Sequence, residues 1–187
     1  KGNRVLIACK PNQTTVKIVY MGRMSSFDDI MELFGRFNVK CAVFDIEPET
    51  RQVKEFISLV RYPVYMCKYL QSQHNDPAFD SEEHRVTINR TEICDETHNL
   101  VDPSYTSRRL VLPRRNTETE FFASELCNIA KVLSEDKTTG SREYSYRRLD
   151  KGFDDYYHSL NYLGLALRKV GISKVENRKV AKVKRDG

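Results

Sequence analysis

The sequence lacks several patterns that identify common classes of enzyme. It has no Gly-x-x-x-x-Gly-Lys-Ser/Thr phosphate-binding loop, so this chain by itself is not expected to hydrolyse ATP with that machinery. It also has no Gly-x-Ser-x-Gly elbow, and His74, His84 and His98 are scattered without forming a nucleophilic constellation. No internal repeat is visible. Any catalytic chemistry must therefore come from other residue types.

Long apolar runs and paired cysteines are absent as well. No apolar stretch approaches the length of a membrane span, and the opening KGNRVLIACKP lacks the apolar core and cleavage site of a signal peptide. The five cysteines are dispersed, and no pair has the CxxC spacing of a zinc site. We therefore expect buried, reduced thiols in a cytosolic protein with no membrane partner.

The size and charge of the chain are compatible with one ordinary domain. Its 187 residues can form a single well-packed core. Lys and Arg number 31 against 26 Asp and Glu, which gives a formal net charge of +5 at pH 7. This mild excess permits an anionic partner without requiring one.

The order of apolar patterns predicts strands that alternate with helices. Apolar stretches at 4–9 and 16–21 flank the turn-forming residues PNQTT and predict an opening hairpin. After the capping residues SSFDD, an i, i+3, i+4, i+7 spacing predicts a helix with Ile30, Leu33, Phe34 and Phe37 on its buried face. Further strands are predicted at 41–44, 64–70, 85–89 and 109–113, with a polar loop at 71–84. Residues 138–155 are predicted to form a hairpin or an exposed strand. Helices are predicted from about Pro48, from about Thr91, over 122–133 and from Asp154 to Val170. This order predicts an α/β fold with a mixed sheet.

Carboxylates occur at two predicted element ends. Asp45 and Glu47 follow the apolar run CAVF, and Asp154 and Asp155 open the last helix. Binding sites in open α/β sheets form at the carboxyl ends of strands. Carboxylates brought close together repel one another unless a cation lies between them, and hard oxygen ligands select Mg²⁺ or Mn²⁺. The alternative is that these acids only cap helices, where free N–H groups and the helix dipole stabilise a negative charge.

Three segments in order resemble one known family. FDIEPETRQVKEF, RTEICDE and DDYYHSLNYLGLAL are similar in order and spacing to the C-terminal nuclease domain of phage large terminases, from the opening hairpin to about Gly171. The resemblance implies an RNase H-like α/β fold over residues 1–172, with a central mixed β-sheet flanked by helices on both faces. It implies a hydrolase, a metal-dependent endonuclease that cuts double-stranded DNA with two Mg²⁺ or Mn²⁺ ions during viral genome packaging. The basic residues 173–187 are expected to form a flexible tail.

The resemblance also assigns roles to single residues. Asp45 corresponds to the second metal-binding carboxylate of the family and Asp154 to the third, while Asp155 resembles an auxiliary ligand or water-positioning group. Glu47 is within reach of this site, and His158, one turn from Asp154, is a candidate to orient a carboxylate or to bind phosphate.

Two further positions follow from the same resemblance. Asp95, in a predicted helix, is expected near the cleft. The family's first Asp, in a Gly-x-Asp-x-Gly pattern, would come immediately before Lys1, which would make the strand at 4–9 the second strand of the fold.

A basic segment precedes Asp154. Arg142, Arg147, Arg148 and Lys151 predict a hairpin that guides the DNA backbone, and a solvated charged strand is the alternative. The resemblance implies as partners double-stranded DNA, the ATPase domain of the same polypeptide, the portal and the small terminase subunit. It implies a location in the cytoplasm of an infected bacterial host, with transient binding to the procapsid. Two other functions stay open, namely a resolvase-like nuclease on branched DNA and a non-catalytic RNase H-like module that binds nucleic acid or protein.

Overall fold

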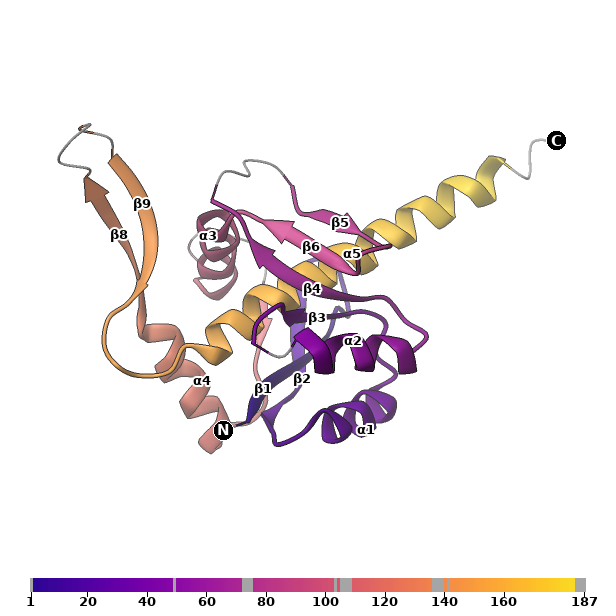
Figure 1. The fold of residues 1–187 in the computed structure, drawn as a ribbon, viewed down its shortest axis with the longest axis horizontal. Coiled ribbons are helices and arrows are strands. Elements are labelled where there is room, and N and C mark those ends of the chain that lie inside the picture. Colours follow the sequence, from indigo (N-terminus) through magenta and orange to yellow (C-terminus); the bar gives the residue numbers. More distant parts are fainter. Residues whose placement is uncertain are drawn as a thin grey trace.

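The computed structural model is a mixed α/β structure with five helices and three sheets in the residues that it describes (Figure 1). These are residues 2–48, 50–71, 76–102, 104, 109–135, 140 and 142–183, with side chains described as far as Gly171. In chain order the elements are β1 (Asn3–Cys9), β2 (Thr15–Met24), α1 (Phe27–Phe37), β3 (Ala42–Asp45), α2 (Thr50–Leu59), β4 (Val64–Tyr69), β5 (Ala78–Asp80), β6 (Arg85–Ile88), α3 (Arg90–Val101), β7 (Arg109–Val111), α4 (Thr117–Cys127), β8 (Ile129–Glu135), β9 (Arg142–Arg148) and α5 (Asp155–Val183).

The strands are divided among three sheets. β1 and β2 form the predicted antiparallel hairpin, and β7 pairs parallel to β2. β3, β4 and β6 are parallel, with β5 antiparallel to β6 at the edge. β8 and β9 form a separate hairpin that projects from the rest of the molecule (Figure 1). The α/β class is therefore confirmed, whereas the single central sheet is replaced by two larger sheets and a hairpin.

One face of the strands packs against α1 and α2. Val5 and Ile7 of β1 share a core cluster with Phe34 of α1 and Phe56 of α2. Residues from the second sheet enter the same cluster, because Ala42 of β3 and Val64 of β4 also belong to it. The two larger sheets thus bury neighbouring parts of one hydrophobic core.

The opposite face packs against α5. Leu6, which points away from Val5 and Ile7, packs against Tyr156 and Leu160 of this helix. In the second sheet, Tyr65 of β4 clusters with Leu165 of α5. Helices therefore cover both faces of the strands, as predicted, and α5 runs across the molecule (Figure 1).

Local sequence explains where α1 begins and ends. The Ser26 side chain accepts the N–H of Asp29, and the Asp29 carboxylate accepts the N–H of Ser26, both at 3.1 Å, which is a capping box. Asn38 ends the helix in a left-handed conformation with φ of 49°. The capping residues predicted from SSFDD are confirmed.

The helix predicted over 122–133 is wrong in its second half. α4 ends at Cys127, Asn128 follows as its C-terminal cap, and β8 begins at Ile129. Ile129, Ala130 and Leu133 fit a helical spacing, but pairing with β9 provides their backbone groups with partners in a strand. Tertiary pairing therefore decided the conformation of a segment whose local pattern was ambiguous.

Three other expectations differ in extent. β5 lies inside the predicted loop 71–84. α5 continues to Val183 instead of ending at Val170, so it includes most of the segment expected to be a tail, while residues 184–187 lie outside the described part. All five cysteines are free thiols, but only Cys67 and Cys94 are fully buried. No helix in the described ranges is both long and apolar enough to cross a membrane.

Candidate functional site

Asp45 lies at the carboxyl end of β3, where the strand meets α5. The Tyr162 hydroxyl of α5 donates a hydrogen bond to Asp45 Oδ2 at 2.8 Å. The backbone N–H of Glu47 donates to Asp45 Oδ1 at 3.2 Å. Asp45 is exposed whereas Tyr162 is buried, so the carboxylate sits at the rim of the core and is held from both sides. Glu47 contributes through its backbone, and its side chain is exposed.

Asp154 directly precedes α5 and is held by two basic groups. Its carbonyl oxygen accepts the N–H of His158 at 3.1 Å. Its carboxylate lies 3.6 Å from His158 Nε2 and 3.6 Å from Arg148 Nη1 at the base of the β8–β9 hairpin. The polar His158 ring lowers the pKa of Asp154 most, and the charges of Arg148 and Arg90 lower it further, although partial burial opposes them. Asp154 therefore stays ionised to a lower pH than a free aspartate does.

Aromatic and polar side chains connect the two carboxylates. The Tyr69 hydroxyl at the end of β4 lies 3.2 Å from His158 Nδ1. The Tyr162 ring stacks against both neighbours, with centroids 6.1 Å from Tyr69 and 6.4 Å from His158. Asp45, Tyr162, Tyr69, His158 and Asp154 thus form one continuous group, which we call the β3–α5 cluster. The two carboxylates that sequence reasoning singled out lie at its two ends.

The two tyrosines of this cluster have raised pKa values. Burial raises the pKa of Tyr162 far above its usual range, and the nearby Tyr69 and Asp45 raise it further. Burial also raises the pKa of Tyr69. Asn161, fully buried in α5, donates to the Tyr69 hydroxyl at 3.2 Å and accepts a hydrogen bond from Thr97 of α3. Because both pKa values are raised, the two hydroxyls keep their protons across physiological pH.

The cluster supplies oxygen ligands of the kind that Mg²⁺ or Mn²⁺ prefers, but it is not a complete metal site. Asp45 and Asp154 offer hard carboxylate oxygens. Within the described ranges, no three Asp, Glu, His or Cys side chains are grouped so that they could hold a metal ion. Asp155 is exposed at the first position of α5. The donor chemistry fits a divalent ion, and full coordination needs ligands beyond these two carboxylates.

The basic segment predicted as a hairpin or exposed strand over 138–155 contains only the second strand, β9, of the β8–β9 hairpin, and its cations do not share one face. Arg148 is opposite Ile129 and Arg142 is opposite Glu135, which places both arginines on the same face of the ribbon. Arg147 is opposite Ala130 on the other face, where its guanidinium donates to Ser134 Oγ at 2.9 Å. Lys151 is exposed in the loop after β9. A single phosphate backbone lying on one face would therefore miss Arg147.

Asp95 anchors the hairpin instead of joining the β3–α5 cluster. It accepts hydrogen bonds from Lys131 Nζ at 2.7 Å and from the Tyr146 hydroxyl at 2.6 Å, one from each strand of the hairpin. The Tyr146 ring also stacks on His98 of α3 with a centroid distance of 5.0 Å. The hairpin is thus fixed to α3 at its base.

A second acidic group positions the start of α5, and sequence reasoning missed it. Glu125 of α4 accepts hydrogen bonds from Arg4 Nη2 at 3.1 Å and from the backbone N–H of Tyr156 at 2.6 Å. The Arg4 guanidinium also lies 4.8 Å from the centroid of the Tyr156 ring. Glu125 is only 5% exposed, so this ion pair joins β1, α4 and α5 inside the protein.

Other members of the site had weaker sequence signals. Tyr69, Asn161 and Tyr162 were not singled out, because buried aromatic and amide side chains are common in any core. One usable signal was spacing: His158 and Tyr162 follow Asp154 at successive four-residue steps, which aligns all three on one face of α5. A buried Asn within an apolar helical pattern was the other.

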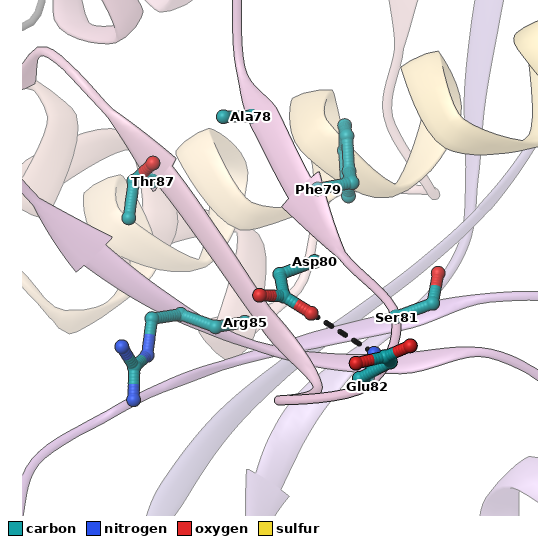
Figure 2. Close-up of a pocket in the computed structure, with 7 residues that line it drawn as sticks. All are labelled: Ala78, Phe79, Asp80, Ser81, Glu82, Arg85 and Thr87. Atoms are coloured by element: carbon teal, nitrogen blue, oxygen red, sulfur yellow. Dashed lines mark hydrogen bonds between the residues drawn. The ribbon is translucent and has the colours of Figure 1, made fainter.

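Figure 2 shows an open pocket at β5, β6 and the turn between them. Asp80 in its wall accepts the backbone N–H groups of Glu82 and Glu83, both at 2.9 Å, so this carboxylate serves the turn between the two strands. None of the pocket residues belongs to the β3–α5 cluster. The pocket is lined by Ala78, Phe79, Asp80, Ser81, Glu82, Arg85 and Thr87.

Comparisons of the chain with protein-family models, with curated proteins and with solved structures find no match.

Proposed function

We propose that this chain is the metal-dependent endonuclease domain of a viral DNA-packaging motor, which hydrolyses phosphodiester bonds of double-stranded DNA. The observation that supports this most is the β3–α5 cluster, in which Asp45 and Asp154 occupy the ends of one connected group at the rim of the core. Its position at the carboxyl ends of parallel strands is where α/β sheets place their sites.

Each residue of the cluster has a defined part in this proposal. Asp45 and Asp154 would supply ligands to two divalent ions, with Asp155 assisting, and the bound ions would activate water and stabilise the leaving oxygen. Tyr162 fixes the orientation of the Asp45 carboxylate. His158 and Arg148 keep Asp154 ionised at the start of α5. Arg142 and Arg148, which share one face of the hairpin, would contact the DNA backbone.

The finer fold assignment belongs to the same proposal. An RNase H-like arrangement is supported by the order of hairpin, α1, β3, α2 and β4, with α5 on the opposite face. Among the described strands, β1 pairs only with β2 and β3 only with β4, although both contribute to one core. A further strand and its Asp, expected before Lys1, would pair with one of these open edges and add a ligand. The partners stay as proposed: DNA, the ATPase domain, the portal and the small terminase subunit, in the host cytoplasm and on the procapsid.

Nicking of supercoiled plasmid in Mn²⁺ tests this function, using a chain that extends upstream of Lys1. Asp45→Asn and Asp154→Asn should each abolish nicking because each removes a metal ligand. Asp28→Asn, an exposed acid in the first turn of α1, is the matched control and should nick normally. Full activity in Asp45→Asn contradicts the proposal. Preference for four-way junctions over linear duplex would indicate a resolvase-like nuclease, and absence of nicking by the unmutated chain would favour a binding module.

A further inference from the structure

The loop between β9 and α5 exposes two large apolar side chains next to the candidate site. Leu149 is 64% exposed and Phe153 is 68% exposed, the highest values among large apolar side chains in the described ranges. They lie at the two ends of residues 149–153, which we call the wedge loop. Phe153 immediately precedes Asp154, and Leu149 immediately follows Arg148. Both apolar side chains are therefore available to a partner beside these two charged groups.

The wedge loop is a fixed structure, and Asn128 holds it at three points. The N–H of Leu149 donates to the Asn128 carbonyl at 2.8 Å, and the N–H of Asp150 donates to Asn128 Oδ1 at 3.2 Å. The Asn128 side-chain amide donates to the Phe153 carbonyl at 3.4 Å. The two apolar side chains therefore point outward from a bound backbone and are not exposed merely because the loop is loose.

Two side chains of the loop and its anchor approach Gly152 closely. A Cβ atom at this position would lie 2.7 Å from Asp150 Oδ1 and 2.8 Å from Asn128 Nδ2. A larger residue would have to push these two side-chain ends aside, so glycine is the residue that lets Asn128 and Asp150 keep their hydrogen bonds in the turn. The result is a compact loop whose exposed residues are Leu149, Asp150, Lys151 and Phe153, and the Asp150 carboxylate is turned back onto the N–H of Gly152.

The charges around the loop indicate the class of partner. Arg148 is 47% exposed and contacts Asp154, and Lys151 is exposed at the loop apex. The acids nearby are engaged or belong to the proposed metal site: Asp150 accepts the N–H of Gly152, Asp154 faces Arg148 and His158, and Asp155 opens α5. A nucleic-acid strand satisfies both sets of groups, because its bases stack on aromatic rings while its phosphates pair with cations.

We propose that the wedge loop binds an unstacked base of DNA while the backbone of the same strand lies at Asp154. This inference rests on the proposed nuclease function and names its preferred substrate: a duplex with a distorted or unpaired step. In a regular duplex each base is stacked on both sides, so Phe153 gains a base face only where stacking is already weak. Apolar side chains that enter a base step in this way kink the duplex and separate its bases.

DNA binding at equilibrium, without cleavage, tests whether the wedge loop binds an unstacked base. Fluorescence anisotropy compares two duplexes that differ by one central mismatch. The mismatched duplex carries 2-aminopurine beside the mismatch, and its fluorescence rises when that base unstacks. The unmutated chain should bind the mismatched duplex more tightly and raise this signal. Phe153→Ala should lose about tenfold in affinity for the mismatched duplex, the scale of one base–aromatic stack, and little for the matched one.

Two further variants separate stacking from general effects. Phe153→Trp keeps an aromatic face and should retain the mismatch preference. Leu59→Ala, which removes a side chain that is 61% exposed at the end of α2, should bind both duplexes normally. Thermal melts should be unchanged for all three variants, because each side chain is mostly exposed.

The outcomes distinguish this inference from the function on which it rests. Equal affinity of the unmutated chain for both duplexes, or unchanged binding by Phe153→Ala, overturns the wedge and leaves the nuclease proposal intact. Complete absence of DNA binding by the unmutated chain overturns both. Retained mismatch preference together with full nicking by Asp45→Asn supports the wedge and overturns the nuclease.

Discussion

Two acidic side chains, Glu125 and Asp154, are engaged at the start of α5, and they differ in burial. The Glu125 side chain is 6% exposed, and its two oxygens are taken by Arg4 and by the N–H of Tyr156. The Asp154 side chain is 22% exposed, and its basic neighbours lie at 3.6 Å. Both groups combine an acid, a base and a tyrosine at one helix end. Glu125 is buried and both of its oxygens are hydrogen-bonded, which indicates a structural role. Asp154 is more exposed, so a ligand can reach its carboxylate oxygens.

The largest expected effect is on the buried group. Glu125→Ala leaves the Arg4 guanidinium without its closest partner inside the protein and removes the acceptor for the Tyr156 N–H. Breaking a buried ion pair from one side typically costs about 3–5 kcal/mol, so we expect a loss of that size in urea-induced unfolding. Glu120→Ala breaks an exposed ion pair with Arg115 and should change stability by less than about 1 kcal/mol. Similar losses of stability in the two variants would contradict a structural role for the buried Glu125 ion pair.

A smaller effect is expected from Tyr162→Phe. This change removes the hydrogen bond to Asp45 and keeps the ring that stacks on Tyr69. The unfolding free energy should fall by about 1 kcal/mol, the usual worth of one hydrogen bond. Plasmid nicking should fall more steeply than this loss explains, because Asp45 is no longer held in one orientation. Tyr62→Phe is a control that removes a hydroxyl outside the cluster. A stability loss with unchanged nicking would make Tyr162 purely structural.

The smallest effect concerns the titration of Asp154. Since the folded state lowers its pKa below the ordinary 3.8, ionised Asp154 stabilises the protein above that pH, and this contribution is lost as the pH falls through the lowered pKa. The stability difference between the unmutated chain and Asp154→Asn should be small at pH 6 and should vanish on acidification. Adding His158→Gln should shrink the difference at pH 6. A difference that grows toward low pH would contradict the assigned charge state.

Sequence patterns predicted the features that depend on near neighbours along the chain. The capping box of Ser26 and Asp29, the opening hairpin and the acid that ends β3 all followed from short-range spacing. β8 was missed because Ile129, Ala130 and Leu133 fit a helix as well as a strand, and the choice depends on pairing with β9. The same strand register places Arg147 on the face opposite Arg142 and Arg148.

The site was predicted in part for a similar reason. Asp45 and Asp154 were found because acids at element ends are conspicuous, but the tyrosines that connect them looked like ordinary core residues. Glu125 gave no signal, since an acid in a polar helix is normally exposed. Its role is decided by Arg4 and Tyr156, which are remote from it in sequence.

The contact between β1 and α5 has a consequence for the order in which the protein is made. Ser159 Oγ donates to the Arg4 carbonyl at 3.0 Å across a separation of 155 residues, and Arg4 pairs with Glu125 across 121. At about 5–20 residues per second, the ribosome needs roughly 8–30 seconds to supply Ser159 after Arg4. For most of that time the first strand can pair with β2 but has neither its buried counter-charge nor its covering helix, and Glu125 is made before the helix is. The nascent domain therefore stays incomplete until its last helix emerges, and premature termination before α5 leaves a charged, half-covered sheet for chaperones and proteases.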